Sequence, residues 1–192
     1  MYRPSNLEKW ISDRYIKMDI LYPSDLKPKL IAKAFDIDYE THFAPAYSSI
    51  EYGEAFIVTD KRVSHEKQNE QFFHELCHVL LHEGNQNIMV EMFRHKQEWD
   101  AHAFTMYAAI PYYMIDFSVE NTIKSLQERF NVPYTIAKKR FNNIQQKLYV
   151  ASKQIQIPKK SYEVSPYNLE GRSAETKRLI MQLNRQVGYR TI

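Results

Sequence analysis

His74-Glu75-Leu76-Cys77-His78 is a HExxH motif inside a segment whose residue pattern predicts a helix. Two histidines four residues apart project from the same face of a helix. Both imidazoles can therefore reach one zinc ion at about 2.0–2.1 Å. Glu75 follows the first histidine directly, where it can act as a general base on water held at the metal. The motif predicts a zinc-dependent hydrolytic site built on one helix.

The helix that carries this motif has start and stop signals. Ser64 is a favourable N-cap, and Gly84 is typical of the residue just beyond a helix end. The pattern predicts a helix from His65 to Glu83, and its core side carries apolar residues at helical spacing: Phe72, Leu76, Val79 and Leu80. The alternative is a surface stripe that holds two histidines by chance, and the agreement of motif and helix disfavours it.

A zinc peptidase site needs a third protein ligand and keeps its fourth position for water. The candidates lie in a second predicted helix, about 20 residues after His78. Glu98 and His102 are neighbours at i and i+4 on one face of this helix, and Asp100 points roughly the other way. Either Glu98 binds the metal while His102 supports it or a ligand histidine, or the two exchange roles. The apolar side of the same helix is predicted to hold Trp99, Ala103, Phe104 and Met106.

The order of these motifs resembles that of a known family. His74-Glu-Leu-Cys-His-Val-Leu-Leu-His82, followed by Glu98-Trp-Asp-Ala-His-Ala-Phe104 and then Pro111, resembles the ImmA/IrrE-type metallopeptidases. Those proteins typically carry HELGHxLLH and later E-x-E/Q-A-N/D-x-F-A before a Leu-Met-Pro-like segment. The seven-residue interval from Phe104 to Pro111 matches that pattern. The resemblance therefore aligns Glu98 with the metal-binding glutamate of the family.

The resemblance covers roughly residues 1–150 and carries expectations about fold and function. It implies an α+β fold, a mostly helical zincin-like metallopeptidase domain with a small β-sheet beside the HExxH helix, and further C-terminal helices. It implies zinc bound by His74, His78 and Glu98, with Glu75 as the catalytic base and His102 supporting the ligands. The best understood members cleave helix-turn-helix transcriptional repressors of phages, mobile elements or stress responses. The expected function is therefore that of a zinc endopeptidase that acts on a repressor.

Three positions depart from the family pattern. Cys77 replaces a Gly, His102 stands where Asn or Asp is usual, and Thr105 replaces an Ala. Changes in residues that support metal ligands can cost about 10–100-fold in metal affinity or activity. The unusual His102, together with the basic C-terminal region, leaves open an alternative: a non-catalytic zinc-containing regulatory protein that binds and sequesters a repressor. Cys77 shares part of the ligand face, but we expect it to pack in the core as a small hydrophobic residue.

The composition is that of a soluble intracellular protein. Of the 192 residues, 44% are hydrophobic and 26% are charged, which is ordinary for a globular domain. No apolar run approaches the ~18–20 residues that span a bilayer, and no signal-peptide pattern opens the chain. A single cysteine excludes an internal disulfide framework and suits a reducing cytosol. We expect a cytoplasmic protein with no membrane partner.

Two helices and short strands are predicted before the motif. Helical spacing runs from Leu7 to Met18 after a Pro4-Ser5 cap, and a second helix is predicted from Pro23 to Phe35. Alternation from Ile37 to Phe43 and a β-prone run over residues 55–59 predict strands. The edge of such a sheet can receive an extended peptide by strand addition, which suits a peptidase. The second helix is predicted to bury Leu26, Leu30, Ile31 and Ala34.

The segment from Thr122 to Leu148 predicts two apolar-periodic helices around Asn131-Val132-Pro133. The basic cluster Lys138-Lys139-Arg140 gives this pair the look of a DNA-reading helix-turn-helix. Helix pairs of this form are common packing units, however, and three adjacent basic residues usually form a solvated face. Direct binding of nucleic acid is therefore kept as a less favoured hypothesis.

The C-terminal region is more basic than the rest. We predict a metallopeptidase domain over residues 1–150, which includes the helix pair, and a basic linker and helix over residues 151–192. The second region holds 8 Lys/Arg and 3 Glu. Prolines and serines over residues 158–166 predict the linker, and Ser173 is a favourable cap for the last helix. Docking on the core, binding of a partner and contact with nucleic acid all stay open for this helix.

Overall fold

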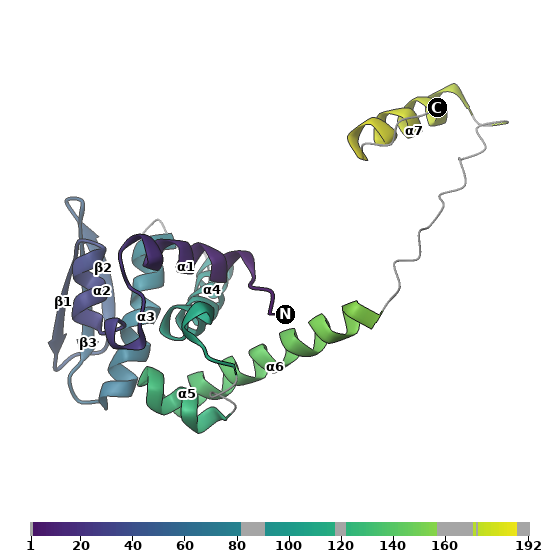
Figure 1. Ribbon diagram of the computed structural model, residues 1–192. Helices are drawn as coiled ribbons and strands as arrows, with labels where there is room; N and C mark the ends of the chain where they lie inside the picture. Colours follow the sequence, from purple (N-terminus) through teal and green to yellow (C-terminus); the bar gives the residue numbers. More distant parts are fainter. Residues whose placement is uncertain (1, 82–90, 118–121, 157–170, 172, 188–192) are drawn as a thin grey trace. The chain divides into compact units, whose positions relative to one another are not determined.

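A computed structural model describes residues 2–81, 91–117, 122–156, 171 and 173–187 (Figure 1). The chain divides into two compact units, Met1–Ile155 and Gln156–Ile192. In the first unit, helix α3 (His65–Leu81) packs against a three-stranded sheet on one side and against helix α4 (Glu91–Ala109) on the other. This is the predicted α+β arrangement, mostly helical with a small sheet beside the HExxH helix.

Helix α1 (Asn6–Lys17) begins where the sequence predicts. The Ser5 hydroxyl accepts a hydrogen bond from the Glu8 amide at 3.3 Å, and the Ser5 amide donates to the Glu8 carboxylate at 2.6 Å. This reciprocal capping box satisfies backbone N–H groups that the first turn leaves free. Ile11 and Tyr15 lie one turn apart on the buried face of the helix. Helix α1 packs against α4 through this face.

The predicted single helix from Pro23 to Phe35 is wrong. A short 3-10 turn, η1 (Pro23–Asp25), is followed by the separate helix α2 (Pro28–Ala34). Pro28 has no N–H and its ring clashes with a preceding helical turn, so it fits only at the start of a helix. The break also changes the buried face. Leu26 and Ile31 are buried as predicted, Ala34 is partly buried, and Leu30 is exposed.

The sheet has the strand order β1-β3-β2. Strands β1 (Ile37–His42) and β3 (Glu54–Asp60) are parallel, and they confirm the two predicted strands. Strand β2 (Tyr47–Glu51) had no specific prediction; it pairs antiparallel with β3 and forms an edge of the sheet. Tyr52 and Gly53 both have positive φ, at 55° and 89°, as the tight two-residue turn between β2 and β3 requires.

Helix α3 starts at the predicted residue. The Ser64 hydroxyl accepts from the Lys67 amide at 3.4 Å, which caps the first turn. The ring of Phe72 meets that of Tyr39 in β1 at 5.2 Å between centroids, and this contact ties the helix to the sheet. The predicted end at Glu83, with Gly84 beyond it, lies outside the described residues. The most buried residues of α3 are Asn69, Phe72, Phe73, Leu76, Cys77 and His78.

Helix α4 buries a face that shares only Phe104 with the predicted one. Its buried positions follow helical spacing, as i, i+3, i+4 and i+7: Ala101, Phe104, Thr105 and Ala108. Trp99 was predicted on this side, but its exposed fraction is 79%. At 3.6 residues per turn, Trp99 lies about 200° around the helix from Ala101, which places it on the opposite face.

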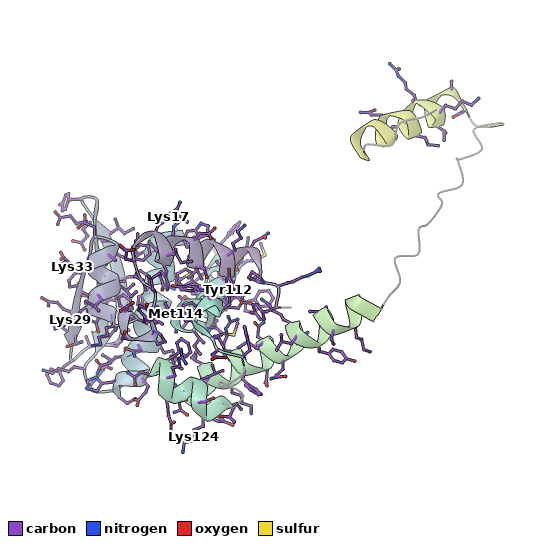
Figure 2. All side chains as sticks on the ribbon, in the orientation of Figure 1. Lys17, Lys29, Lys33, Tyr112, Met114 and Lys124 are labelled. Atoms are coloured by element: carbon purple, nitrogen blue, oxygen red, sulfur yellow. The ribbon has the colours of Figure 1, made fainter. Side chains whose placement is uncertain are left out.

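The predicted helix pair is present. Helix α5 (Ile123–Phe130) begins at the N-cap Thr122, and helix α6 (Tyr134–Gln156) follows a turn in which Asn131 is left-handed at a φ of 49°. Side chains fill the space between the helices of this unit (Figure 2), where the short turn η2 (Tyr112–Met114) lies among them. The pair packs through the predicted apolar residues, of which Leu126, Phe130, Ile136 and Ile144 are buried.

Arg140 in α6 is buried, so the prediction of a solvated basic face is wrong for this residue. Its side chain is 0% exposed and donates to Glu8 in α1 at 2.7 Å and to the carbonyl of Ile110 at 3.1 Å. Lys147, two turns later, is also paired with Glu8. The neighbouring Lys138 and Lys139 are exposed. A buried arginine needs a buried anion, and Glu8 supplies it across the first unit.

The stability of the domain is expected to fall between about pH 4.5 and pH 2 because of Glu8. Burial alone raises the pKa of Glu8, but the Arg140 charge and the hydrogen bonds from Lys147 and Ser5 outweigh it and bring the pKa from 4.5 to about 2. A carboxylate with a lowered pKa in the folded state stabilises above its unfolded pKa, and this contribution is lost as the pH falls.

The measurement is denaturant unfolding of metal-free protein at several pH values in that window. The reference is a double variant, Glu8→Leu with Arg140→Met, which replaces the ion pair by apolar side chains. Other carboxylates are common to both proteins, so they cancel in the comparison. The free energy of unfolding should fall more steeply for the natural protein. Parallel pH profiles would show that Glu8 does not set this dependence.

The second unit contains helix α7 (Ala174–Val187). The hydroxyl of Ser173 accepts from the Thr176 amide at 3.2 Å, which confirms the predicted cap. The predicted linker at residues 158–166 lies outside the described residues. Among the helices that the structure describes, none is long and apolar enough to cross a membrane.

Candidate metal centre

Helices α3 and α4 bring three potential ligands together. Nε2 of His74 and Nε2 of His78 are 3.2 Å apart, because the two residues lie one turn apart on α3. Glu98 reaches this pair from α4, with Oε2 at 3.2 Å from His74 Nε2 and Oε1 at 3.5 Å from His78 Nε2. One ligand atom from each of the three residues lies within 4.8 Å of the others.

These distances fit a tetrahedral metal site. In a tetrahedral zinc site with ligand bonds of about 2.0–2.2 Å, neighbouring ligand atoms are about 3.3–3.6 Å apart. The distance between the two histidine nitrogens, and the distance from each of them to its own oxygen of Glu98, are close to this spacing. Two imidazoles and one carboxylate leave one tetrahedral position open, as catalytic zinc sites do. The donor set and its spacing therefore suit a divalent metal.

The local electrostatics favour the metal-binding form of His74. Burial lowers the pKa of His74, the Glu98 carboxylate opposes this effect, and the His102 imidazole adds to the lowering. The net shift is downward, so the ring is neutral at neutral pH. A neutral imidazole has the nitrogen lone pair that metal binding requires.

Glu75 lies at the interface between α3 and the sheet. Burial raises the pKa of its carboxyl group, and so does the nearby Glu98 charge, while a hydrogen bond from Ser48 lowers it. The Ser48 hydroxyl, on edge strand β2, donates to Glu75 Oε2 at 2.8 Å. The net shift is upward, which brings the pKa of the carboxyl group closer to neutral pH, where a general base works best.

The remaining residues with a predicted place near the site lie around it. His102 is exposed, and its ring centroid is 5.4 Å from that of His74. Asp100 is exposed and is not a member of the ligand group found among the described residues. Cys77 is 0% exposed and packs in the core. Burial and the Asp100 and Glu98 charges raise the pKa of Cys77 to about 12, so its thiol stays protonated.

Ser48 is the residue near the site that sequence reasoning missed. It lies 27 residues before Glu75, in a strand that had no specific prediction. Gly53, in the turn after Tyr52, was the available signal for a hairpin over residues 47–60. The register of that hairpin places Ser48 opposite Ile57, a core residue facing α3. Only the packing of the sheet on α3 shows that Ser48 reaches Glu75.

The chain is similar to known proteins over the same region. The model of the M78 peptidase family, described as the IrrE N-terminal-like domain, matches residues 30–142. This range includes strands β1 to β3, helices α3 and α4, and all the residues brought together at the candidate site.

Two relatives come from Bacillus subtilis (strain 168). The chain is 33% identical to the protein YqaB over 156 residues, in a match that covers 77% of this chain and 88% of YqaB. It is 37% identical to the phage-like element PBSX protein XkdA over 113 residues, which are 58% of this chain and 56% of XkdA. The similarity to YqaB extends over more of the chain than the family model covers.

Proposed function

Because this chain belongs to the M78 peptidase family, whose model describes the IrrE N-terminal-like domain, we propose that it is a zinc-dependent endopeptidase. Its proposed substrate is a helix-turn-helix transcriptional repressor. One observation carries the proposal. His74, His78 and Glu98 converge at the spacing of a tetrahedral site, and the carboxyl group of Glu75 is near enough to Glu98 for the Glu98 charge to raise its pKa. Family membership supports a metallopeptidase, and the donor set supports zinc as the metal.

The proposed reaction divides the work between the metal and Glu75. When zinc is bound by His74, His78 and Glu98, it supplies a Lewis acid that polarises the scissile carbonyl and acidifies water. Glu75 accepts a proton from the attacking water at one carboxylate oxygen. As the carbon–nitrogen bond of the peptide breaks, the same carboxyl group returns this proton to the leaving amine. The two fragments thus gain the atoms of one water molecule.

The repressor as substrate rests on different support. It follows from the resemblance to ImmA/IrrE-type proteins, and the relative XkdA is named as a protein of a phage-like element. Control of such an element by cleavage of its repressor fits this setting. The cytoplasm is the proposed compartment, because repressors act there and the single cysteine, Cys77, is buried as a thiol.

The test is incubation of the purified, zinc-loaded protein with a purified helix-turn-helix repressor encoded beside it. We expect two repressor fragments, whose masses locate one cleaved peptide bond, and none after zinc is chelated. An intact repressor that stays bound to the protein would support sequestration without catalysis. A repressor that is neither cleaved nor bound would overturn the proposed substrate.

A further inference from the structure

Ser48 contacts Glu75, although the proposed reaction gives Ser48 no role. Its hydroxyl donates a hydrogen bond of 2.8 Å to Oε2 of Glu75, between residues on two different elements. Strand β2 provides Ser48, and helix α3 provides Glu75, directly after the ligand His74. The hydroxyl therefore touches the side chain proposed as the base without belonging to the ligand group.

The strand holds Ser48 in a fixed place. Ser48 pairs with Ile57 of β3, whose side chain is 0% exposed in the core beneath α3. Sheet and helix are joined again where Tyr39 of β1 contacts Phe72 of α3. A group held by a paired strand is positioned more precisely than one on a loop. The Ser48 hydroxyl thus has the fixed geometry that an orienting contact needs.

We propose that Ser48 is a positioning residue for the catalytic base: its hydroxyl holds Oε2 of Glu75 and thereby turns the other carboxylate oxygen toward the water that attacks the substrate. This inference rests on the proposed function. A carboxylate accepts through two oxygens, so a donor fixed on one of them sets the direction of the other. Proton transfer depends on this direction, because the base must lie within hydrogen-bond reach of the proton it takes.

The first arm of the test is kinetic and uses the repressor cleaved by the zinc-loaded protein. Ser48→Ala should lower kcat by about 10–100-fold, the range typical of losing a side chain that orients a group at a metal site, with KM and zinc content unchanged. Ser48→Thr keeps the hydroxyl and suits a strand, so it should restore most of the activity. The matched control is Ser49→Ala, because the Ser49 hydroxyl contacts Glu51, at 3.4 Å, rather than Glu75.

The second arm does not depend on activity. In zinc-loaded protein with 13C-labelled glutamate carboxyl groups, the Glu75 signal is identified by its loss in Glu75→Gln. At one fixed pH, this signal should shift or broaden in Ser48→Ala and return to its normal position in Ser48→Thr. It should stay unchanged in Ser49→Ala.

The outcomes separate this inference from the proposed function. If Glu75→Gln abolishes cleavage but Ser48→Ala cleaves at the normal rate, Ser48 has no positioning role and the proposed function stands. If Ser48→Ala loses zinc or raises only KM, the contact serves structure or binding instead, and the inference is wrong. If the natural protein itself does not cleave the repressor, the proposed function fails. An unchanged Glu75 signal in Ser48→Ala would show that Ser48 does not hold Glu75, and the inference would be wrong whatever the activity.

Discussion

Replacing Glu75 with Gln is expected to abolish repressor cleavage while zinc stays bound. Glutamine has nearly the same shape, and its carbonyl oxygen can still accept the hydrogen bond that Ser48 donates to Glu75. Its amide cannot take a proton from water, so the general-base contribution, roughly 10²–10⁴-fold in rate, is lost. Cleavage is followed by gel analysis of repressor fragments, and zinc by metal analysis of the same samples.

Glu66→Gln is the matched control, since Glu66 lies on α3 in its first turn, away from the ligands. This variant should cleave at the normal rate. Full activity of Glu75→Gln would contradict the proposed mechanism. Unimpaired repressor binding by Glu75→Gln without cleavage would agree with it, because the substitution leaves the substrate surface intact.

Replacing Glu98 with Ala is expected to remove most of the bound zinc. Each oxygen of Glu98 faces one of the two imidazole nitrogens, and without it the metal keeps only two protein ligands. His102→Ala should weaken zinc binding only about 10–100-fold, since an exposed ring beside His74 can support a ligand but is outside the ligand group. Asp100→Ala should have the smallest effect. Competition titration with a zinc chelator ranks the three variants.

Glu91→Ala provides the control for loss of a carboxylate from the same helix. Glu91 is exposed, in the first turn of α4, and its variant should bind zinc normally. If His102→Ala loses the metal and Glu98→Ala keeps it, the site has three histidine ligands and the alignment of Glu98 with the family glutamate is wrong.

Much of the fold was predictable because its signals are local. Ser64 and Ser173 cap helices through bonds that span only three residues. The alternation over β1 and the β-prone run of β3 are likewise properties of short stretches of sequence. The prediction of one helix from Pro23 to Phe35 was wrong because the apolar spacing continues across Pro28, whereas the helical backbone cannot continue through a proline. The prediction that Trp99 is buried was wrong because a large apolar residue was assumed to lie on the buried face of α4, whereas small residues such as Ala101 lie there.

Only the part of the candidate site that lies on one helix was predictable from the sequence. His74 and His78 follow from spacing within α3, since a turn of helix fixes their distance. The convergence of Glu98 on them depends on how α4 packs on α3, and spacing alone left His102 as an equal choice. Ser48 could not be found at all, because its contact with Glu75 depends on the sheet, the hairpin register and the helix together.

The Arg140–Glu8 pair has a consequence for how the chain folds as it is made. The two residues are 132 positions apart, and Lys147 is 139 from Glu8. At a synthesis rate of about 5–20 residues per second, roughly 7–26 s pass between the appearance of Glu8 and that of Arg140. Both helices that carry the proposed zinc ligands are complete before α6 begins. A nascent chain that pauses before Arg140 thus holds every proposed ligand, together with an N-terminal helix whose Glu8 carboxylate, buried in the finished fold, still lacks its Arg140 partner.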